Sequence, residues 1–388
     1  MNRSLFAASL LSATRETLIN PSLHVMNRIY TLTANLLSST IIRPFIKPVV
    51  QQLSGSSDVA HHLSSGGATT IDGKEKLCIV TGANTGIGKQ TSLKLCEQGY
   101  TVILGCRSRS KGEEAAQEIN SIINLKGKAA FLHPLDLSSI ASVKNFAAAF
   151  KEKYSSLNVL VNNAGINTSG KTADGFDLCF QTNFLGHYLL TRLLMPCLLR
   201  AKNTKSETGR IVNLSSVMHH FATFRQTKNN WADATKPYCP NTYSDSKLAA
   251  ILFTIQLNRR YGKDGIRALS VNPGAVNSDI WRSIPSFLRK YVLGPIFRLL
   301  YLNCDQGSYT TVAAVLNDFP DDTIYLQPYW LPTPRKINGS NSYSCPFPPF
   351  EMLGPFSGYA VTQPRLPSDG GLESSESLWA VCEKLFDL

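Results

Sequence analysis

The sequence predicts an α/β protein with a parallel, doubly wound sheet that helices cover on both faces. From residue 76 onward, short apolar runs alternate with longer stretches of helical character. The first run passes directly into glycine-rich sequence. Alternating strand and helix units imply right-handed crossovers and therefore a parallel sheet. Apolar residues make up 43% of the 388, enough for a large core.

Six short apolar runs are the candidate strands, and helices are expected between them. The strands are Leu77–Thr81, Thr101–Gly105, Ala129–His133, Val159–Asn162, Arg210–Leu214 and Ala268–Val271. The helices are Gly88–Glu97, Lys111–Asn124, Ser139–Tyr154, Phe176–Leu199 and Ser244–Tyr261. One more helix is expected at Asp305–Leu316 and the last strand at Ser357–Val361.

The chain is predicted to consist of an extension and a single domain. Residues 1–73 form an N-terminal extension that ends in a Ser-, Gly- and His-rich linker, and residues 74–388 form the α/β domain. Residues 323–355 hold many Pro and aromatic residues, which a regular helix or a central strand does not accommodate. We expect an insertion there, before the last strand and opposite the active-site end of the sheet. It is a surface loop, or a contact for a partner or a membrane.

Composition sets the N-terminal extension apart from the domain. Up to residue 57 its acidic residue is Glu16, against Arg3, Arg15, Arg28, Arg43 and Lys47. This favours a transit peptide for a mitochondrion or plastid, or a segment on a membrane surface. A disordered extension and a signal peptide are the alternatives. The uncharged run Ile29–Ile42 is shorter than the roughly 20 apolar residues that a transmembrane helix needs.

The charge balance narrows the possible partners. The formal net charge of +12 is compatible with nucleic acid, an anionic membrane or a phosphorylated ligand. The sequence has no zinc-finger spacing, RNA-recognition signature or block of five Lys or Arg residues, which argues against nucleic acid. Its nine cysteines form no CxxC pair and indicate reduced thiols, so a secreted protein is not expected.

A glycine-rich turn follows the first strand and begins the first helix. Its glycines permit a tight turn, bring backbone N–H groups close to a pyrophosphate and place it at the positive end of the helix. The residues expected to bind the cofactor here are Gly82, Asn84, Thr85, Gly86, Ile87 and Gly88. Together with the alternating pattern, this turn predicts a Rossmann-type sheet that binds a dinucleotide.

The spacing of this turn is GxxxGxG, and four more motifs follow it. They are Asn162-Asn163-Ala164-Gly165, Asn213-Leu214-Ser215-Ser216, Tyr243-Ser244-Asp245-Ser246-Lys247 and Pro273-Gly274. In these motifs the chain resembles the short-chain dehydrogenase/reductase superfamily. The finer resemblance is to its retinol-dehydrogenase-like branch. It is carried by TGANTGIGK from Thr81, TNFLGHY from Thr182, SSVMHH from Ser215, SKLAAILFT from Ser246, and Leu378-Trp379 in a terminal helix.

The resemblance implies a catalytic group made of Asn183, Ser216, Tyr243 and Lys247. Tyr243 and Lys247 are four residues apart, so they share one helix face. A free tyrosine has a pKa near ~10, and we expect the Lys247 ammonium and the positive nicotinamide ring to lower it. Tyr243 then exchanges the proton with the substrate.

The other members of the group take their roles from the resemblance. Lys247 matches the residue that holds the nicotinamide ribose, and Asn183 matches the one that anchors a proton-relay water. Ser216 matches the residue that binds the substrate oxygen. Adjacent strand residues face opposite ways, so either Ser215 or Ser216 can point into the site, and the resemblance selects Ser216.

Arg107, at the end of the second strand, favours NADP(H) over NAD(H). An acidic residue there would bind the ribose 2′-hydroxyl and repel a 2′-phosphate, and none is present. Arg107 can form a forked, charge-assisted pair with that phosphate, whereas Lys111 is interpreted as part of a solvated helix start. The resemblance adds further cofactor-binding residues: Asp136 beside the adenine, Asn163 as a brace of the central strand, Pro273 and Gly274.

We expect an oxidoreductase that transfers a hydride between NADP(H) and a carbonyl or its alcohol. The resemblance suggests a small apolar substrate, such as a retinoid, a steroid or a long-chain aldehyde, contacted by Phe221–Trp231 and Ile280–Tyr291. Two alternatives stay open. One is a light-dependent protochlorophyllide reductase-like enzyme, prompted by the YxDSK motif and the plastid-like leader, and the other is a non-catalytic protein that senses NADP(H). His187, His219 and His220 have no carboxylate or thiolate partners at ligand spacing, so no metal is expected.

Overall fold

The computed structural model describes residues 76–122, 124–201, 209–223, 242–276, 302–328, 360–361, 364 and 366–388. They belong to one unit, residues 63–388. The predicted extension 1–73 lies outside the described residues, as do residues 329–355 of the predicted insertion. So do residues 224–231 and 280–291, which are expected to contact the substrate.

In the described part of the chain, the strands form one sheet in the order β3-β2-β1-β4-β5-β6-β7-β8. β1 to β7 are parallel, and β8 is antiparallel to β7. The strands are β1 Lys76–Thr81, β2 Tyr100–Gly105, β3 Lys128–Ala130, β4 Val159–Asn162, β5 Gly209–Leu214, β6 Ile266–Val271, β7 Tyr325–Gln327 and β8 Ala360–Val361. The strand order reverses between β1 and β4, where open α/β sheets bind their ligands.

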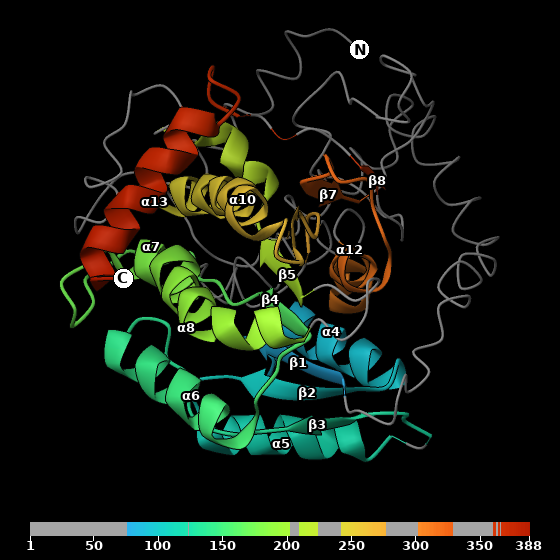
Figure 1. Cartoon of the computed structure of the whole chain (residues 1–388). Coiled ribbons are helices and arrows are strands. Elements are labelled where there is room, and N and C mark those ends of the chain that lie inside the picture. Colours follow the sequence, from blue (N-terminus) through green and yellow to red (C-terminus); the bar gives the residue numbers. More distant parts are fainter. Residues whose placement is uncertain are drawn as a thin grey trace, which may run out of the picture. The chain divides into compact units, whose positions relative to one another are not determined.

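Helices cover both faces of the sheet (Figure 1). They are α4 Gly86–Glu97, α5 Arg109–Asn120, α6 Ile140–Lys153, α7 Leu178–Phe180, α8 Gly186–Arg200, α10 Thr242–Tyr261, α12 Cys304–Leu316 and α13 Leu372–Phe386. Two short elements adjoin them, the π-helical segment η2 (Gln181–Leu185) and the 3-10 helix η3 (Val217–Phe221). Among the described residues, no helix has the length and apolar character that crossing a membrane requires.

The sheet separates two buried apolar clusters. Ile79 of β1 contributes to the cluster that includes residues of α6, α8, α10 and α13. Its neighbours Cys78 and Val80 contribute to the cluster with α4, α5 and α12. Successive strand residues point to opposite faces, so apolar residues at consecutive positions are what a sheet covered on both sides requires. The predicted parallel α/β sheet is confirmed.

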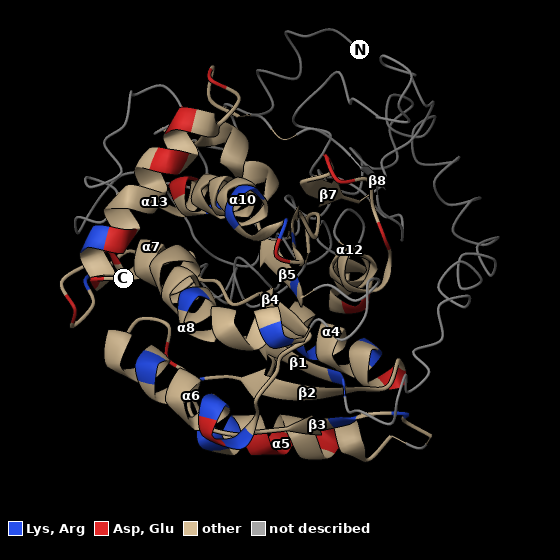
Figure 2. Cartoon of the chain, in the orientation of Figure 1, with Lys and Arg blue, Asp and Glu red and all other residues tan. Residues whose placement is uncertain are grey.

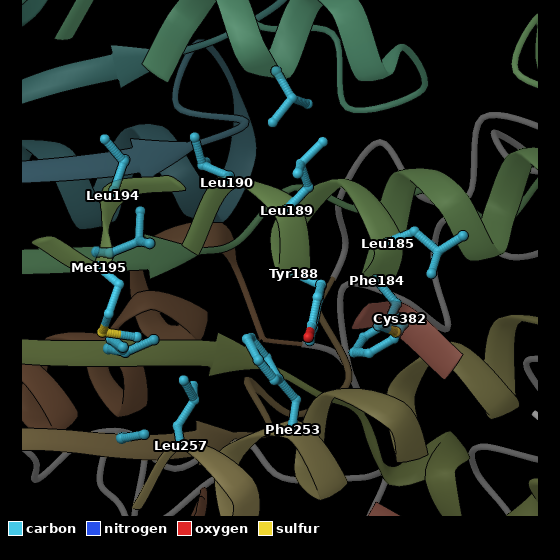
Figure 3. Close-up of a cluster of buried hydrophobic side chains, with 14 of the residues drawn as sticks. Phe184, Leu185, Tyr188, Leu189, Leu190, Leu194, Met195, Phe253, Leu257 and Cys382 are labelled. Atoms are coloured by element: carbon cyan, nitrogen blue, oxygen red, sulfur yellow. The ribbon is translucent and has the colours of Figure 1, made fainter. Parts of the chain in front are cut away.

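The C-terminal helix α13 packs against α8 and α10 through aromatic side chains. The Tyr188 ring of α8 lies 5.0 Å from the Phe253 ring and 5.3 Å from the Trp379 ring, measured between centroids. Figure 3 shows Tyr188 and Phe253 pointing toward one another. The Tyr188 hydroxyl donates to Glu383 Oε1 at 2.6 Å. In Figure 2, most residues of α8 and α10 are uncharged, which fits the buried position of these helices. The predicted terminal helix is confirmed.

Some predicted bounds are wrong. The strand predicted to reach His133 ends at Ala130, because it is an edge strand that pairs with β2 only from Lys128 to Ala130. The helix predicted at Phe176–Leu199 is interrupted by η2.

The predicted insertion also begins too early. Residues 323–355 were expected to hold no central strand, yet Tyr325–Gln327 form β7, paired with both β6 and β8. Three residues are too few to show the alternation of a strand, and Pro328 follows them directly. Of the last strand predicted at Ser357–Val361, the structure describes Ala360–Val361.

Candidate active site

The glycine-rich turn joins β1 to α4 in a conformation that requires glycine at certain positions. Gly86 has φ of +59°, and a Cβ there would meet nothing nearer than Cys304 Sγ at 4.0 Å. At Gly88 a Cβ would lie 2.4 Å from the Gly82 carbonyl oxygen, so a side chain does not fit. The first turn of α4 contains no acidic residue. Its N–H groups and partial positive charge therefore suit an anion such as a pyrophosphate.

A cleft of about 360 Å³ lies along the carboxyl ends of β1, β2, β4 and β5. This volume is within the range of small-molecule sites. Its walls include the predicted residues Gly82, Asn84, Thr85, Gly86, Ile87, Gly88, Arg107, Asp136, Asn163, Tyr243, Lys247 and Pro273. Gly274 is not part of the wall, and its neighbours are Pro328 and Leu302. The donor-rich turn and the extent of the cleft, which passes the ends of four strands, fit a dinucleotide.

Two basic residues lie at the end of the cleft formed by β2 and α5. Arg107 and Lys111 are exposed and line it. Arg109 instead pairs with Glu113 at 3.1 Å, and its guanidinium lies over the Phe131 ring. Ser108 caps α5 by accepting from the Lys111 N–H. Lys111 is exposed in the first turn of α5, as expected for a solvated helix start, and it also lines the cleft next to Arg107.

Thr81 and Asn163 join the ends of β1 and β4. Asn163 Nδ2 donates to the Thr81 carbonyl at 2.7 Å. The backbone N–H groups of Asn163 and Ala164 both donate to Thr81 Oγ1, each at 2.9 Å. Asp136 Oδ1 accepts from the backbone N–H of Ser138 at 2.9 Å, which fixes its carboxylate in the cleft wall.

Tyr243 and Lys247 lie on the first turns of α10, beside the end of β5. Lys247 Nζ is 5.6 Å from the centre of the Tyr243 ring and donates to the Leu214 carbonyl at 2.9 Å. The Ser216 side chain interacts with Tyr243 and lowers its pKa in part. Ser215 is buried and donates to the Lys247 carbonyl at 2.8 Å. Ser215, but not Ser216, is part of the cleft wall, and the role of Ser216 in binding the substrate oxygen stays a prediction.

Asn183 lies in the π-helical segment η2, a rare conformation that is frequent at functional sites. Its side chain accepts from the Ile166 N–H at 2.8 Å and donates to the Ile166 carbonyl at 2.9 Å. It also donates to Ser246 Oγ at 3.1 Å. A Cβ at Gly165 would lie 3.5 Å from both Asn183 Oδ1 and Lys247 Nζ, so these two polar groups border the same small space.

Burial is the largest influence on the pKa values of Tyr243 and Lys247. It raises the pKa of Tyr243 to about 12, although the hydrogen bond from Ser216 lowers it in part. Burial also lowers the pKa of Lys247 to about 8. The expected lowering of the Tyr243 pKa by Lys247 and the nicotinamide ring together stays a prediction. In the chain alone, loss of hydration of the phenolate is the largest influence on the pKa of Tyr243.

Sequence reasoning did not identify several cleft residues. Ile166, Thr168 and Thr182 line the cleft, and the Thr182 hydroxyl is buried without a hydrogen-bond partner. Ile166 directly follows the Asn162–Gly165 motif and Thr182 is the first residue of the TNFLGHY motif, and these positions are the signal that could have found them. Thr168 lies three residues beyond Gly165 and carries no such signal. Among the described residues, no group of three His, Cys, Asp or Glu side chains is arranged to hold a metal ion.

Residues 76–288 match the family model described as short chain dehydrogenase. The chain belongs to this family. It is 38% identical to human retinol dehydrogenase 11 over 262 residues, which cover 66% of this chain and 78% of that protein. Over 285 residues it is 37% identical to human retinol dehydrogenase 13, covering 69% and 81%. The retinol-dehydrogenase-like resemblance is confirmed, and the chain is an oxidoreductase of a family that uses nicotinamide cofactors on alcohols and carbonyls.

Solved structures share the fold. An uncharacterized protein from Mycobacterium paratuberculosis superposes with a TM-score of 0.54 at 30% identity, over 80% of this chain and 93% of that one. L-Sorbose reductase from Gluconobacter frateurii, complexed with NADPH and L-sorbose, gives a TM-score of 0.50 at 17% identity, over 62% and 90%. The Rossmann-type architecture is thereby confirmed.

Proposed function

We propose that this protein transfers a hydride between NADP(H) and the carbonyl or alcohol group of a small apolar substrate. The observation that carries the proposal is a single cleft with two ends. One end has the glycine turn and Arg107, and the other has Tyr243 and Lys247, with Ser216 interacting with Tyr243. A bound nicotinamide would supply or accept the hydride.

Arg107 and Lys111 support NADP(H) as the cofactor. Both are exposed, both line the cleft, and Arg107 forms no ion pair with a described carboxylate. A ribose 2′-phosphate there would bind two positive charges, one of them a guanidinium that can donate two parallel hydrogen bonds. A 2′-hydroxyl would gain much less from them.

Tyr243 and Ser216 provide the proton chemistry. Because its pKa is raised to about 12, Tyr243 is a neutral phenol at neutral pH. It can donate a proton to the carbonyl oxygen of the substrate when a hydride is added to the carbonyl carbon. Ser216 donates a hydrogen bond to the same oxygen, and the Lys247 ammonium stabilises the phenolate that remains. In alcohol oxidation the same residues act in reverse.

An apolar substrate is supported by the surface next to Ser216. Phe221, at the end of η3, is 58% exposed. Met218 is partly exposed on the same short helix. Relatives named retinol dehydrogenases act by name on an apolar alcohol. A retinoid, a steroid or a long-chain aldehyde therefore suits this apolar surface.

The test is Tyr243→Phe in the full chain, with NADPH consumption measured against retinaldehyde, a steroid ketone and a long-chain aldehyde. We expect the variant to lose about 10²–10⁴ in kcat, with NADPH affinity within about twofold of the native value. Tyr261→Phe, at the other end of α10, is the matched control and keeps activity. NADPH binding without turnover in the native protein would indicate a sensing protein. Pigment reduction only under light would indicate the protochlorophyllide reductase-like alternative.

We further propose that residues 1–73 direct the enzyme to an organelle or a membrane surface. Their basic, acid-poor composition supports this. Fluorescent fusions of the full chain and of residues 74–388 test it. Identical distributions of the two fusions would rule out both roles for the extension.

A further inference from the structure

His187, on the first turn of α8, is a buried histidine that the proposed reaction does not use. It is 4% exposed. Its Nε2 lies 2.8 Å from Thr81 Oγ1, at the end of β1, and its Nδ1 lies 2.9 Å from the Asn183 carbonyl oxygen in η2. One imidazole therefore connects the strand that leads into the glycine turn with the residue implied to anchor the proton relay.

The hydrogen bonds around Thr81 determine which nitrogen of His187 carries the proton. A hydroxyl oxygen has two lone pairs and one proton. The backbone N–H groups of Asn163 and Ala164 both donate to Thr81 Oγ1, which occupies both lone pairs. The hydroxyl proton then points to His187 Nε2, since the Val161 carbonyl is farther away, at 3.4 Å. Nε2 is therefore an acceptor, and Nδ1 carries the proton that it donates to Asn183.

These bonds continue into the catalytic group. Asn183 Nδ2 donates to Ser246 Oγ at 3.1 Å, and Ser246 Oγ donates to the Tyr243 carbonyl at 2.7 Å. The chain from Thr81 through His187, Asn183 and Ser246 thus reaches the residue that exchanges the proton. Every hydroxyl, amide or imidazole in it is buried and directional, so the position of one member limits the position of the next.

We propose that His187 is a positioning residue, which holds the π-helical segment and Asn183 at a fixed place relative to the glycine turn and Tyr243. The proposal rests on the proposed function, because it assigns His187 a part in the same reaction. A π-helical turn is less favourable than an α-helical one, so a side chain that fixes its carbonyl has a structural task here.

His187 can hold both bonds across the physiological pH range. Burial is the main reason that its pKa is lowered to about 4. The hydrogen bond to Asn183 raises this pKa in part, and the charge of Lys247 lowers it further. Protonation of Nε2 would place a proton opposite the Thr81 hydroxyl proton and break the first bond. The neutral form with the proton on Nδ1 is thus the one that the geometry requires.

Three variants separate the two bonds in the full-length protein. His187→Leu removes both, and we expect kcat to fall about tenfold to a hundredfold with NADPH affinity within about twofold. His187→Asn places an amide donor near the position of Nδ1, and kcat should return to within about threefold of the native value. His187→Gln places its amide near Nε2 instead, so its kcat should stay about tenfold below that of the Asn variant.

Thr191→Val is the matched control, because Thr191 lies one turn farther along α8 and its hydroxyl accepts from Asn162 at 3.1 Å. It removes a buried hydrogen bond of the same helix without touching Asn183, and kcat should stay native. Equal kcat in the Leu variant and the native protein, or equal losses in the Leu variant and Thr191→Val, would overturn the proposal. If His187→Leu does not fold, equal kcat in the Asn and Gln variants overturns it.

Two further measurements separate this proposal from the proposed function. Loss of activity in Tyr243→Phe with native activity in His187→Leu would reject the positioning role alone. Retained activity in Tyr243→Phe would reject the proposed function. Nitrogen-15 NMR of His187 needs no substrate: we expect a neutral ring with the proton on Nδ1 at pH 6. A proton on Nε2, or a charged ring, would contradict the geometry on which the positioning role depends.

Discussion

The proposed cofactor end of the cleft, at Arg107 and Lys111, and the proposed catalytic end, around Lys247, are built in different ways. At the cofactor end, backbone groups of the glycine turn and two exposed side chains, Arg107 and Lys111, face the cleft. At the catalytic end, Lys247, Asn183 and His187 are each at most 5% exposed, and each makes hydrogen bonds to another element.

This difference determines whether a substitution at each end changes stability as well as function. Exposed side chains make few internal bonds, so changing them alters ligand affinity and changes the free energy of unfolding by less than about 0.5 kcal/mol. Buried polar side chains must keep their partners, and losing one leaves another unsatisfied. We therefore expect cofactor-end variants to change affinity alone, and catalytic-end variants to change turnover and stability together.

The largest effect is expected at Lys247. Lys247→Met should lower kcat about a thousandfold, because it removes the charge that stabilises the phenolate and the hydrogen bond to Leu214. In the native protein the pKa of Lys247 is lowered to about 8, so the ammonium is present below this pH and lost above it. NADPH-dependent carbonyl reduction should therefore decline as pH rises through about 8.

The check is a pH profile of NADPH consumption for the native protein and two variants. The exposed Lys263→Met is the matched control and should keep the native profile. Lys247→Met should lack the decline. If activity declines equally with pH in Lys247→Met, the decline is caused by another group. The lowered pKa of the buried Lys247 would then not determine the turnover.

The second effect is acid sensitivity caused by His187. Its folded-state pKa is lowered from 6.5 to about 4, so between these values the unfolded chain binds a proton that the folded protein does not. The free energy of unfolding should therefore decrease by about 3 kcal/mol as pH falls from 6.5 toward 4. Urea unfolding at pH 7 and at pH 4.5 measures it. His187→Gln should lose this share of the acid dependence, and Arg107→Ala at the cofactor end should keep it.

Much of both ends could be predicted from sequence, since the motifs have fixed spacing on predictable elements. Glycines mark the turn, and Tyr243 and Lys247 share a helix face by their separation. The bond between Thr81 and His187 joins residues 106 positions apart and depends on a π-helical turn that no local pattern marks. Whether Arg109 or Lys111 faces the cleft depends on where α5 begins, and that is fixed by the Ser108 cap.

The third effect is a change of cofactor preference at Arg107. Arg107→Ala should weaken NADPH binding about tenfold to a hundredfold, the range expected for hydrogen bonds to a charged group. Affinity for NADH should stay within about twofold, and the free energy of unfolding within about 0.5 kcal/mol. KM values for both cofactors and a urea titration measure these quantities. Equal losses for NADPH and NADH would show that Arg107 does not contact the 2′-phosphate.

The smallest effect is expected two residues farther along, at Arg109. Its guanidinium is held by Glu113 at 3.1 Å and by the Phe131 ring, away from the cleft wall. An exposed pair at this helical spacing contributes about 0.3–0.5 kcal/mol, so Arg109→Ala should lower stability by no more than that. NADPH affinity should stay native. If Arg109→Ala weakens NADPH binding as much as Arg107→Ala does, general positive charge near α5 attracts the phosphate, and the cofactor end does not discriminate through a single directed side chain.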